Sequence, residues 1–154
     1  MVSPQSVRNV LSVPKMKGRF VKLLALGLLT DPRAITLATE RGEVYVAECK
    51  DSTVIVFNTQ GEKIRVLDIK GKTGVSLHYD NVMTLDGQGR LLVSDYHGNR
   101  LFVMDTHSGQ LLHTIGSSGE GLGQFRKPWG LAFTKTGQLA VSEYGNVRTQ
   151  LFSM

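Results

Sequence analysis

The sequence has one cysteine, four prolines and no low-complexity segment. With one cysteine, Cys49, no internal disulfide can form, so we expect a reducing compartment and a cytoplasmic location. The scarcity of proline and the absence of low-complexity tracts argue against extensive disorder. A chain of 154 residues is therefore expected to fold as one domain with its own hydrophobic core.

Long hydrophobic runs are also lacking. The most apolar run, residues 20–29, is too short to span a bilayer and is interrupted by Lys22, so we expect no membrane association. Basic residues precede this run, as they do in a secretory signal peptide. However, the polar leader before it is unusually long for a signal, which disfavours that interpretation.

The body of the chain has no excess of charge of either sign. The formal charge is +5, with 18 basic and 13 acidic residues. Five of the basic residues lie in residues 1–30, which contain no acid. Residues 31–154 therefore contain 13 basic and 13 acidic residues. Net charge therefore does not argue for a basic nucleic-acid groove on the body.

Three landmarks recur along the sequence at a fixed spacing. The turn glycines Gly42, Gly89 and Gly137 are 47 and 48 residues apart. Three acids repeat with the same spacing, each preceded by a valine and a small residue: Glu48, Asp95 and Glu143. A period in the forties indicates a repeat architecture.

Each repeat is predicted to contain four short strands separated by turn residues. The predicted first strands are Ile35–Ala38, Val82–Leu85 and Gly130–Phe133. The acid ends the second strand, the third strands are Thr53–Phe57, Arg100–Met104 and Thr149–Phe152, and the fourth are Lys63–Ile69 and Gln110–Ile115. Four strands per period predict an all-β fold made of β-propeller blades, and no segment has the spacing of an amphipathic helix.

The repeats divide the chain into two full blades, 31–77 and 78–125, and a partial blade, 126–154. Residues 1–30 combine the basic N-terminal segment with a match between Gly18–Gly27 and Gly61–Gly71, which predicts the terminal strands of a preceding partial blade. Propellers close with four to eight blades, so this half-propeller would leave apolar blade faces open. Three interpretations remain: a fragment of a larger propeller, a head-to-tail homo-oligomer, or completion of the last blade by the N-terminal strands.

The last repeat carries a family resemblance. G-x-G-x-G-Q-F-x-x-P-x-G-L-A over Gly119–Ala132, followed by V-S-E-x-x-N-x-R-x-Q-x-F over Val141–Phe152, resembles an NHL repeat. The second copy, Val93–Met104, keeps the acid and the arginine, whereas the first has Thr53 where an arginine is expected. The resemblance implies a β-propeller, commonly six-bladed, similar to the C-terminal propeller of tripartite-motif NHL proteins. In tripartite-motif NHL proteins, this propeller recognises protein or RNA targets.

The repeating polar residues have structural and functional interpretations. Because Glu48, Asp95 and Glu143 recur in every repeat, we expect them to hold turns by accepting hydrogen bonds rather than to form a ring of catalytic carboxylates. Arg100 and Arg148 recur as well, either pairing with the repeat acids or presenting guanidinium groups to a ligand. The loop Gly116–Gly123 lacks the Lys-Ser/Thr of a phosphate-binding loop and is expected to be a crossover between blades.

The candidate binding residues lie on the loops at one rim of the blades. We predict that aromatic and basic side chains there contact a ligand: Tyr96, His97, Arg100, Arg126, Lys127, Trp129, Tyr144 and Arg148. The histidines lack metal-ligand spacing, and no basic surroundings beyond Lys50 activate Cys49, so we expect no metal, cofactor or catalytic residue.

The leading functional hypothesis is a non-catalytic module that binds protein, resembling the substrate-recognition propeller of tripartite-motif ubiquitin ligases. RNA binding by the same rim is the nearest alternative, since aromatic and basic side chains lie together in the sequence there. The second alternative is a metal-dependent propeller lyase or hydrolase, which would need histidines or acids on the innermost strands.

Overall fold

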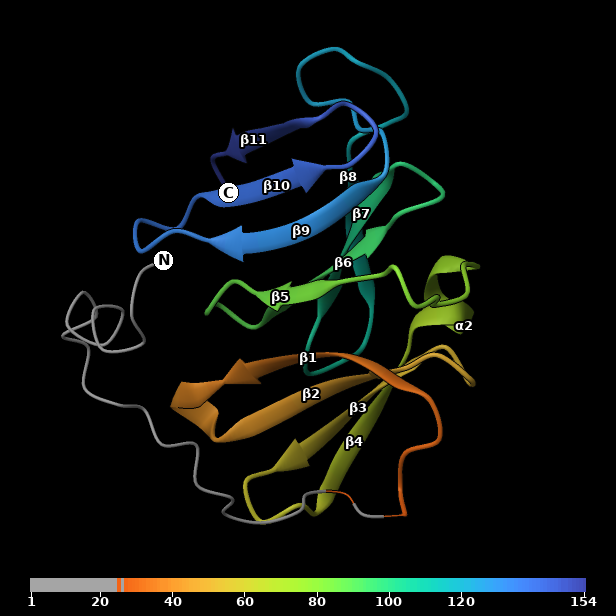
Figure 1. Cartoon of the computed structure of the whole chain (residues 1–154). Helices are drawn as coiled ribbons and strands as arrows, with labels where there is room; N and C mark the ends of the chain where they lie inside the picture. Colours follow the sequence, from red (N-terminus) through yellow and green to blue (C-terminus); the bar gives the residue numbers. More distant parts are fainter. Residues whose placement is uncertain (1–24, 26) are drawn as a thin grey trace, which may run out of the picture.

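The computed structural model describes Ala25 and residues 27–154, which form three antiparallel sheets (Figure 1). The first sheet contains β1 (Pro32–Ala38), β2 (Glu43–Glu48), β3 (Thr53–Asn58) and β4 (Lys63–Asp68). The second contains β5 (Met83–Leu85), β6 (Arg90–Asp95), β7 (Arg100–Asp105) and β8 (Leu111–Ile115). The third contains β9 (Pro128–Phe133), β10 (Leu139–Glu143) and β11 (Arg148–Phe152).

Every sheet is a meander in which each strand pairs with the next one along the chain. The first strands β1, β5 and β9 lie side by side, and the later strands of each sheet extend away from them (Figure 1). Three meanders arranged in this way form an incomplete β-propeller, as predicted. The described residues include no helix that is long and apolar enough to cross a membrane.

The structure shifts several predicted strand ends. β1 begins three residues before the predicted Ile35, at Pro32, and β9 begins at Pro128 instead of Gly130. The larger difference is at Ile69, predicted to end the fourth strand, which begins the short helix α2 (Ile69–Thr73). The Asp68 carboxylate caps this helix by accepting from Gly71 N, and Gly74 ends it in the left-handed conformation.

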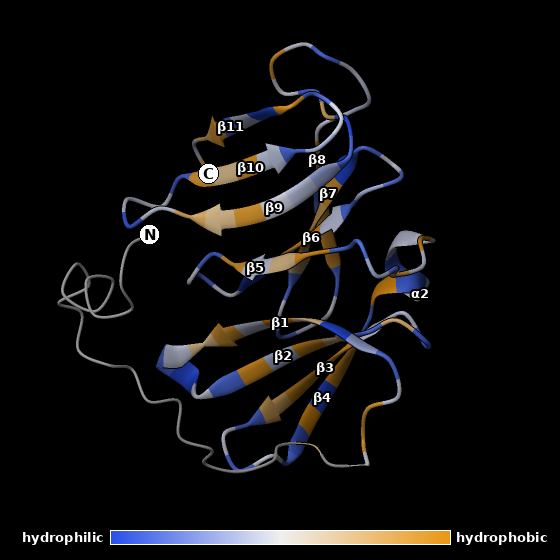
Figure 2. Cartoon of the chain, viewed as in Figure 1, coloured by the Kyte–Doolittle hydropathy of each residue, from blue (hydrophilic) through white to orange (hydrophobic). Residues whose placement is uncertain are grey.

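The cores lie between the sheets. Strand residues alternate between the two faces of a sheet, and polar and apolar colours alternate along much of β4 (Figure 2). One apolar cluster fills the space between the first and second sheets, with members such as Tyr45, Val54, Leu91 and Met104. A smaller cluster around Phe125 joins the second and third sheets. Burial between neighbouring sheets is thus the main source of stability.

A third cluster lies on the face of the first sheet that points away from the second. It contains Ala25, Val44, Val46 and Phe57. The predicted preceding blade in residues 1–30 lies almost wholly outside the described residues, which include only Ala25 and residues 27–30 of that range.

Candidate functional site

The loops that follow the second strand of each sheet lie at the same end of the fold as the crossings from one sheet to the next. The structure brings four predicted residues together there, and we call them the aromatic rim cluster: Tyr96, Lys127, Trp129 and Tyr144. The Tyr96 and Trp129 rings meet edge to face, with centroids 5.4 Å apart. The Lys127 ammonium lies 5.7 Å from the Tyr96 ring centroid and 5.6 Å from that of Tyr144.

Backbone contacts hold this cluster across two sheets. Tyr144 N donates to the Lys127 carbonyl, and Lys127 N donates to the side chain of Asn99 in the second sheet's loop. Lys127 takes a left-handed conformation, with φ of 52°. The cluster is therefore positioned by the contact between the second and third sheets, not by one loop alone.

The cluster is open to solvent beside a shallow hollow. Trp129 is 46% exposed and Tyr144 is 68% exposed. Both line a hollow of about 380 Å³ together with Ser142 and Glu143. Two large exposed aromatic side chains at the edge of a concavity offer apolar area that a partner could bury.

The third repeat acid, Glu143, is buried and fully engaged. Its carboxylate accepts hydrogen bonds from Arg148 Nε at 2.7 Å, Arg126 N at 2.9 Å, Asn146 Nδ2 and Gln150 Nε2. Burial alone would raise the pKa of Glu143, but these donors outweigh it and hold the pKa below its usual range.

The other two repeat acids accept from neighbouring backbone. Glu48 accepts from Thr30 N and Asp31 N, which lead into β1. Asp95 accepts from Gly98 N in its own turn and from Arg100 Nε at 2.9 Å. All three carboxylates therefore hold loops in place and do not converge on a common point.

The arginines of the rim are engaged within the chain. Arg148 donates to Glu143 and to the carbonyls of Glu120, Gly121 and Gln124, so its guanidinium fixes the glycine-rich loop. Arg100 pairs with Asp95. Arg126 pairs with Glu120 at 3.1 Å on the surface. Among the basic rim residues that we predicted, Lys127 alone has no acid within ion-pair distance in the described part of the chain.

His97 lies next to the cluster and contacts a residue that the sequence did not suggest. Its Nε2 is 3.0 Å from Oδ2 of Asp80, which is buried. The other oxygen, Asp80 Oδ1, is buried without a hydrogen-bond partner in the described residues. The signal that could have found Asp80 is its position, because the other two repeats have Pro32 and Pro128 there.

A second polar group that the sequence did not suggest lies between the first and second sheets. Arg65 makes two bonds of 3.0 Å to Glu43, donates to Tyr45 Oη and reaches the Thr106 carbonyl at 2.9 Å. The hydrogen bond from Arg65 is the largest cause of the lowered pKa of Glu43. This network fixes the two sheets relative to each other and lies away from the rim.

Neither an activated thiol nor a group of metal ligands is found among the described residues. Burial raises the pKa of the Cys49 thiol, and the nearby carboxylate of Asp31 raises it further, which disfavours the reactive thiolate. Among residues 25 and 27–154, no three histidine, cysteine or acidic side chains are grouped so that they could hold a metal ion.

Comparison with known proteins finds a curated relative that has NHL repeats. NHL repeat-containing protein 3 from Mus musculus is 30% identical over 107 residues, which is 65% of this chain and 31% of that protein. No family model matches the chain. The chain is thus similar to a protein with NHL repeats, the family that the motif in Gly119–Phe152 resembles, and it spans about a third of this curated relative.

Solved structures show the same fold at low identity. Hydrazine synthase from Kuenenia stuttgartiensis matches with a TM-score of 0.54 and 17% identity, over 78% of this chain and 32% of that one. A catalytically inactive virginiamycin B lyase from Staphylococcus aureus, in complex with quinupristin, matches with a TM-score of 0.57 and 14% identity, over 86% and 44%. At these identities the likeness establishes the fold alone.

Proposed function

We propose that this chain is a non-catalytic recognition module that binds a segment of another protein on the aromatic rim cluster. The observation that carries the proposal is the exposure of Trp129 and Tyr144 beside a hollow, with the Lys127 ammonium held against the rings of Tyr96 and Tyr144. Tryptophan and tyrosine are the residues that most often dominate protein interfaces.

The cluster suits a segment that presents a carboxylate next to an apolar side chain. The apolar side chain would stack on Trp129 and Tyr144, since aromatic faces bury large areas at a small entropic cost. The carboxylate would pair with Lys127, an exposed residue whose ammonium lies 5.7 Å from the Tyr96 ring centroid and 5.6 Å from that of Tyr144. Acidic segments are therefore favoured over basic ones.

Protein is favoured over RNA because the arginines of the rim are already paired. Arg100, Arg126 and Arg148 each face an acid of the chain. An RNA backbone would have to displace these acids, whereas known phosphate-binding surfaces present unpaired cations. The balanced charge of residues 31–154 favours the same conclusion.

In its more specific form, the proposal is that the module supplies substrate recognition to a ubiquitin ligase in the cytoplasm, as tripartite-motif propellers do. The supporting observation is the NHL-type repeat, since the chain itself is similar to an NHL repeat-containing protein. The metal-dependent lyase or hydrolase alternative gains nothing from its fold-level likeness to virginiamycin B lyase. A stoichiometric metal ion in the purified protein would favour that alternative.

Tryptophan fluorescence offers a direct test, because Trp129 is the only tryptophan in the chain. Peptides selected from a displayed random library against the protein should be acidic and should change the Trp129 emission when they bind. Oligouridine RNA should bind weakly, with little dependence on salt. Selected peptides that leave Trp129 emission unchanged would argue against the rim. Tight RNA binding with a steep salt slope would replace the protein hypothesis with the RNA one.

A further inference from the structure

We propose that two copies of this chain associate head to tail and close one ring of six sheets. In this ring the third sheet of each copy covers the open face of the first sheet of the other. The proposal is independent of the ligand of the aromatic rim cluster. It rests on internal comparison of the sheets, because the structure already contains two examples of how one sheet covers the next.

The open face of the first sheet is broad and apolar. Direct cross-strand pairs place the following side chains on it: Ile35, Leu37, Val44, Val46, Ile55 and Phe57. The face is only partly open: Ile35 is 64% exposed and Leu37 is 57% exposed, whereas Val44, Val46 and Phe57 are buried in the cluster that contains Ala25. A contiguous apolar face of this kind is typical of a surface that another protein surface covers.

The second sheet has an apolar face at the equivalent positions of the repeat, and in the second sheet this face is buried. The equivalent cross-strand pairs contain Met83, Leu85, Leu91, Val93, Phe102 and Met104. These side chains form the core between the second sheet and the first, in which Leu91 and Met104 are fully buried. The open face of the first sheet therefore has the chemistry of a surface that receives a preceding sheet.

Ala25 contacts the outer face of the first sheet at the position that the repeat predicts. Ile69 packs in the same buried cluster as Leu91, Val93 and Met104. Ala25 lies 44 residues before Ile69 and packs in the cluster of Val44, Val46 and Phe57, which are the equivalent positions. Ala25 thus occupies the place that the end of a preceding sheet would occupy.

The complementary surface is the free face of the third sheet. Ala140 pairs with Ala132 on one side and with Leu151 on the other, so these three side chains share that face. Leu151 is exposed. The equivalent residues of the second sheet, Leu92 and Val103, are fully buried against the third sheet. The free face of the third sheet is therefore equivalent to the face of the second sheet that packs on the third sheet.

The third sheet also has a place for one more strand. In the described residues its order is β11-β10-β9, whereas the first two sheets each have a fourth strand beyond the third.

A second copy of the chain is the partner that would cover the outer face of the first sheet and close the ring of sheets. Propellers close with typically four to eight sheets. The described residues form three sheets, so one copy is too few, two copies give six, and three copies would give nine. A head-to-tail contact that closes after two copies forms two identical interfaces and leaves no apolar face exposed.

Light scattering of the purified 154-residue chain tests the proposal. We expect a dimer whose mass does not grow with concentration. Ile35→Asp and Leu151→Asp replace exposed side chains on the two opposite faces, so each variant should fold, as judged by circular dichroism, but should be monomeric. Leu122→Asp, in a solvent-exposed loop, is the matched control and should stay dimeric.

A mixing experiment distinguishes a head-to-tail ring from other dimers. In a head-to-tail ring, a mixture of Ile35→Asp and Leu151→Asp copies restores one intact interface, so the mixture should form dimers that neither variant forms alone. A monomeric wild-type chain, a mass that rises steadily with concentration, or a Leu151→Asp variant that remains dimeric would each overturn the proposal. Changes confined to the rim, such as Tyr144→Ala, should leave the mass unchanged.

Discussion

Buried carboxylates of the repeat show how single residues hold this fold. Glu143 accepts hydrogen bonds from Arg148, Arg126 N, Asn146 and Gln150, which come from three segments of the chain. The sequence identified the acid by its periodicity, but it could not identify the donors. The carbonyls that share the Arg148 guanidinium lie 24 to 28 residues away from it.

Removing the charge of Glu143 should destabilise the third sheet. We expect Glu143→Gln to lower the free energy of unfolding by about 2 kcal/mol, because charge-assisted hydrogen bonds are lost and Arg148 keeps only carbonyl acceptors. Urea unfolding measures the change. Glu120→Gln, which removes a carboxylate from an exposed ion pair, is the control and should change the free energy of unfolding little. Equal effects of the two substitutions would contradict this role of Glu143.

Acid should destabilise the protein through the same residue. The pKa of Glu143 is lowered in the folded state. Its contribution to stability is therefore complete above the pKa of a glutamate in the unfolded chain, about 4.3. That contribution is lost as the pH falls below this value and through the folded-state pKa. Urea midpoints measured from pH 7 to pH 3 should therefore fall less steeply for Glu143→Gln than for the wild type. Parallel curves would refute the assignment.

Val147 has a left-handed backbone conformation that is unfavourable for a β-branched side chain. The turns before the third strands each contain a left-handed residue at the same place, Ser52, Asn99 and Val147, and a β-branched residue is the least suited to it. We expect Val147→Gly to raise the free energy of unfolding by about 1 kcal/mol. Val147→Ala, which keeps a Cβ at this position, should gain much less. No gain from glycine would show that the turn relaxes in solution.

Elements of the fold followed from the sequence to differing extents. The strands were predicted because turn glycines and acids recur every 47 or 48 residues. The helix α2 was not, since its stability comes from one capping carboxylate, Asp68, and one buried side chain, Ile69, instead of from an amphipathic pattern. Asp80 was not predicted as a partner of His97, because its departure from the repeat marks the position but does not indicate the contact.

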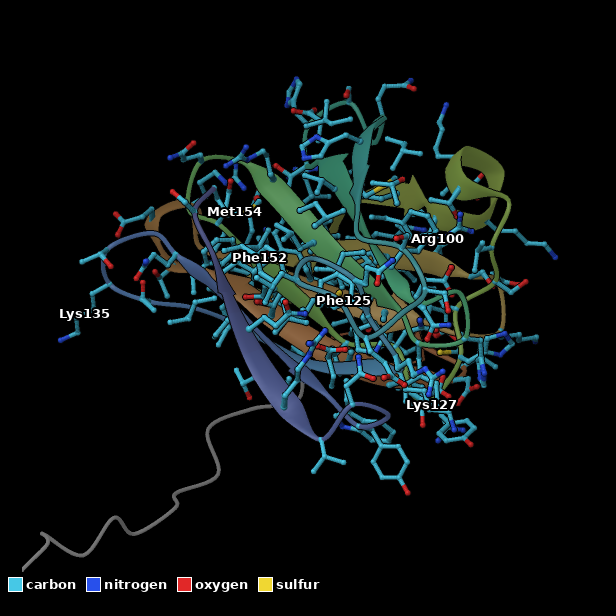
Figure 3. All side chains as sticks on the ribbon, turned by 90° about the horizontal axis from the view of Figure 1, so that it is seen from above. Arg100, Phe125, Lys127, Lys135, Phe152 and Met154 are labelled. Atoms are coloured by element: carbon cyan, nitrogen blue, oxygen red, sulfur yellow. The ribbon has the colours of Figure 1, made fainter. Side chains whose placement is uncertain are left out.

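The glycine-rich loop is an element that owes its shape to packing. Phe125 is fully buried between the second and third sheets and lies 5.5 Å from Phe152 between ring centroids (Figure 3). A Cβ on Gly116 would approach the Phe125 ring to 2.3 Å. The loop is thus a structural crossover, and its carbonyls face Arg148 instead of offering N–H groups to a phosphate.

Truncating Phe125 should loosen this crossover. We expect Phe125→Ala to lower the free energy of unfolding by about 3–5 kcal/mol, the usual cost of removing a buried aromatic side chain. Leu122→Ala, in the same loop but exposed, should be nearly neutral. Thermal unfolding of both variants checks the expectation. A mild effect of Phe125→Ala would mean that the loop closes over the cavity.

At the scale of the whole molecule, the rim and the sheet faces have separate roles. The outer face of the first sheet is apolar, the free face of the third sheet includes Ala132, Ala140 and Leu151, and we assign both faces to association between copies. The aromatic rim cluster lies across the junction of the second and third sheets, where Tyr96 meets Trp129 and Lys127 meets Tyr144. Ligand binding and self-association should therefore be separable by substitution.

The rim hypothesis is tested most directly by the affinity of a selected acidic peptide, followed through Trp129 fluorescence. Tyr144→Ala should weaken binding at least about tenfold, or about 1.4 kcal/mol, as expected for an aromatic interface residue. Lys127→Ala should also weaken it, whereas Lys135→Ala should not, because Lys135 lies at the opposite end of the molecule from Lys127 (Figure 3). An unchanged affinity in both Tyr144→Ala and Lys127→Ala would contradict the proposed function.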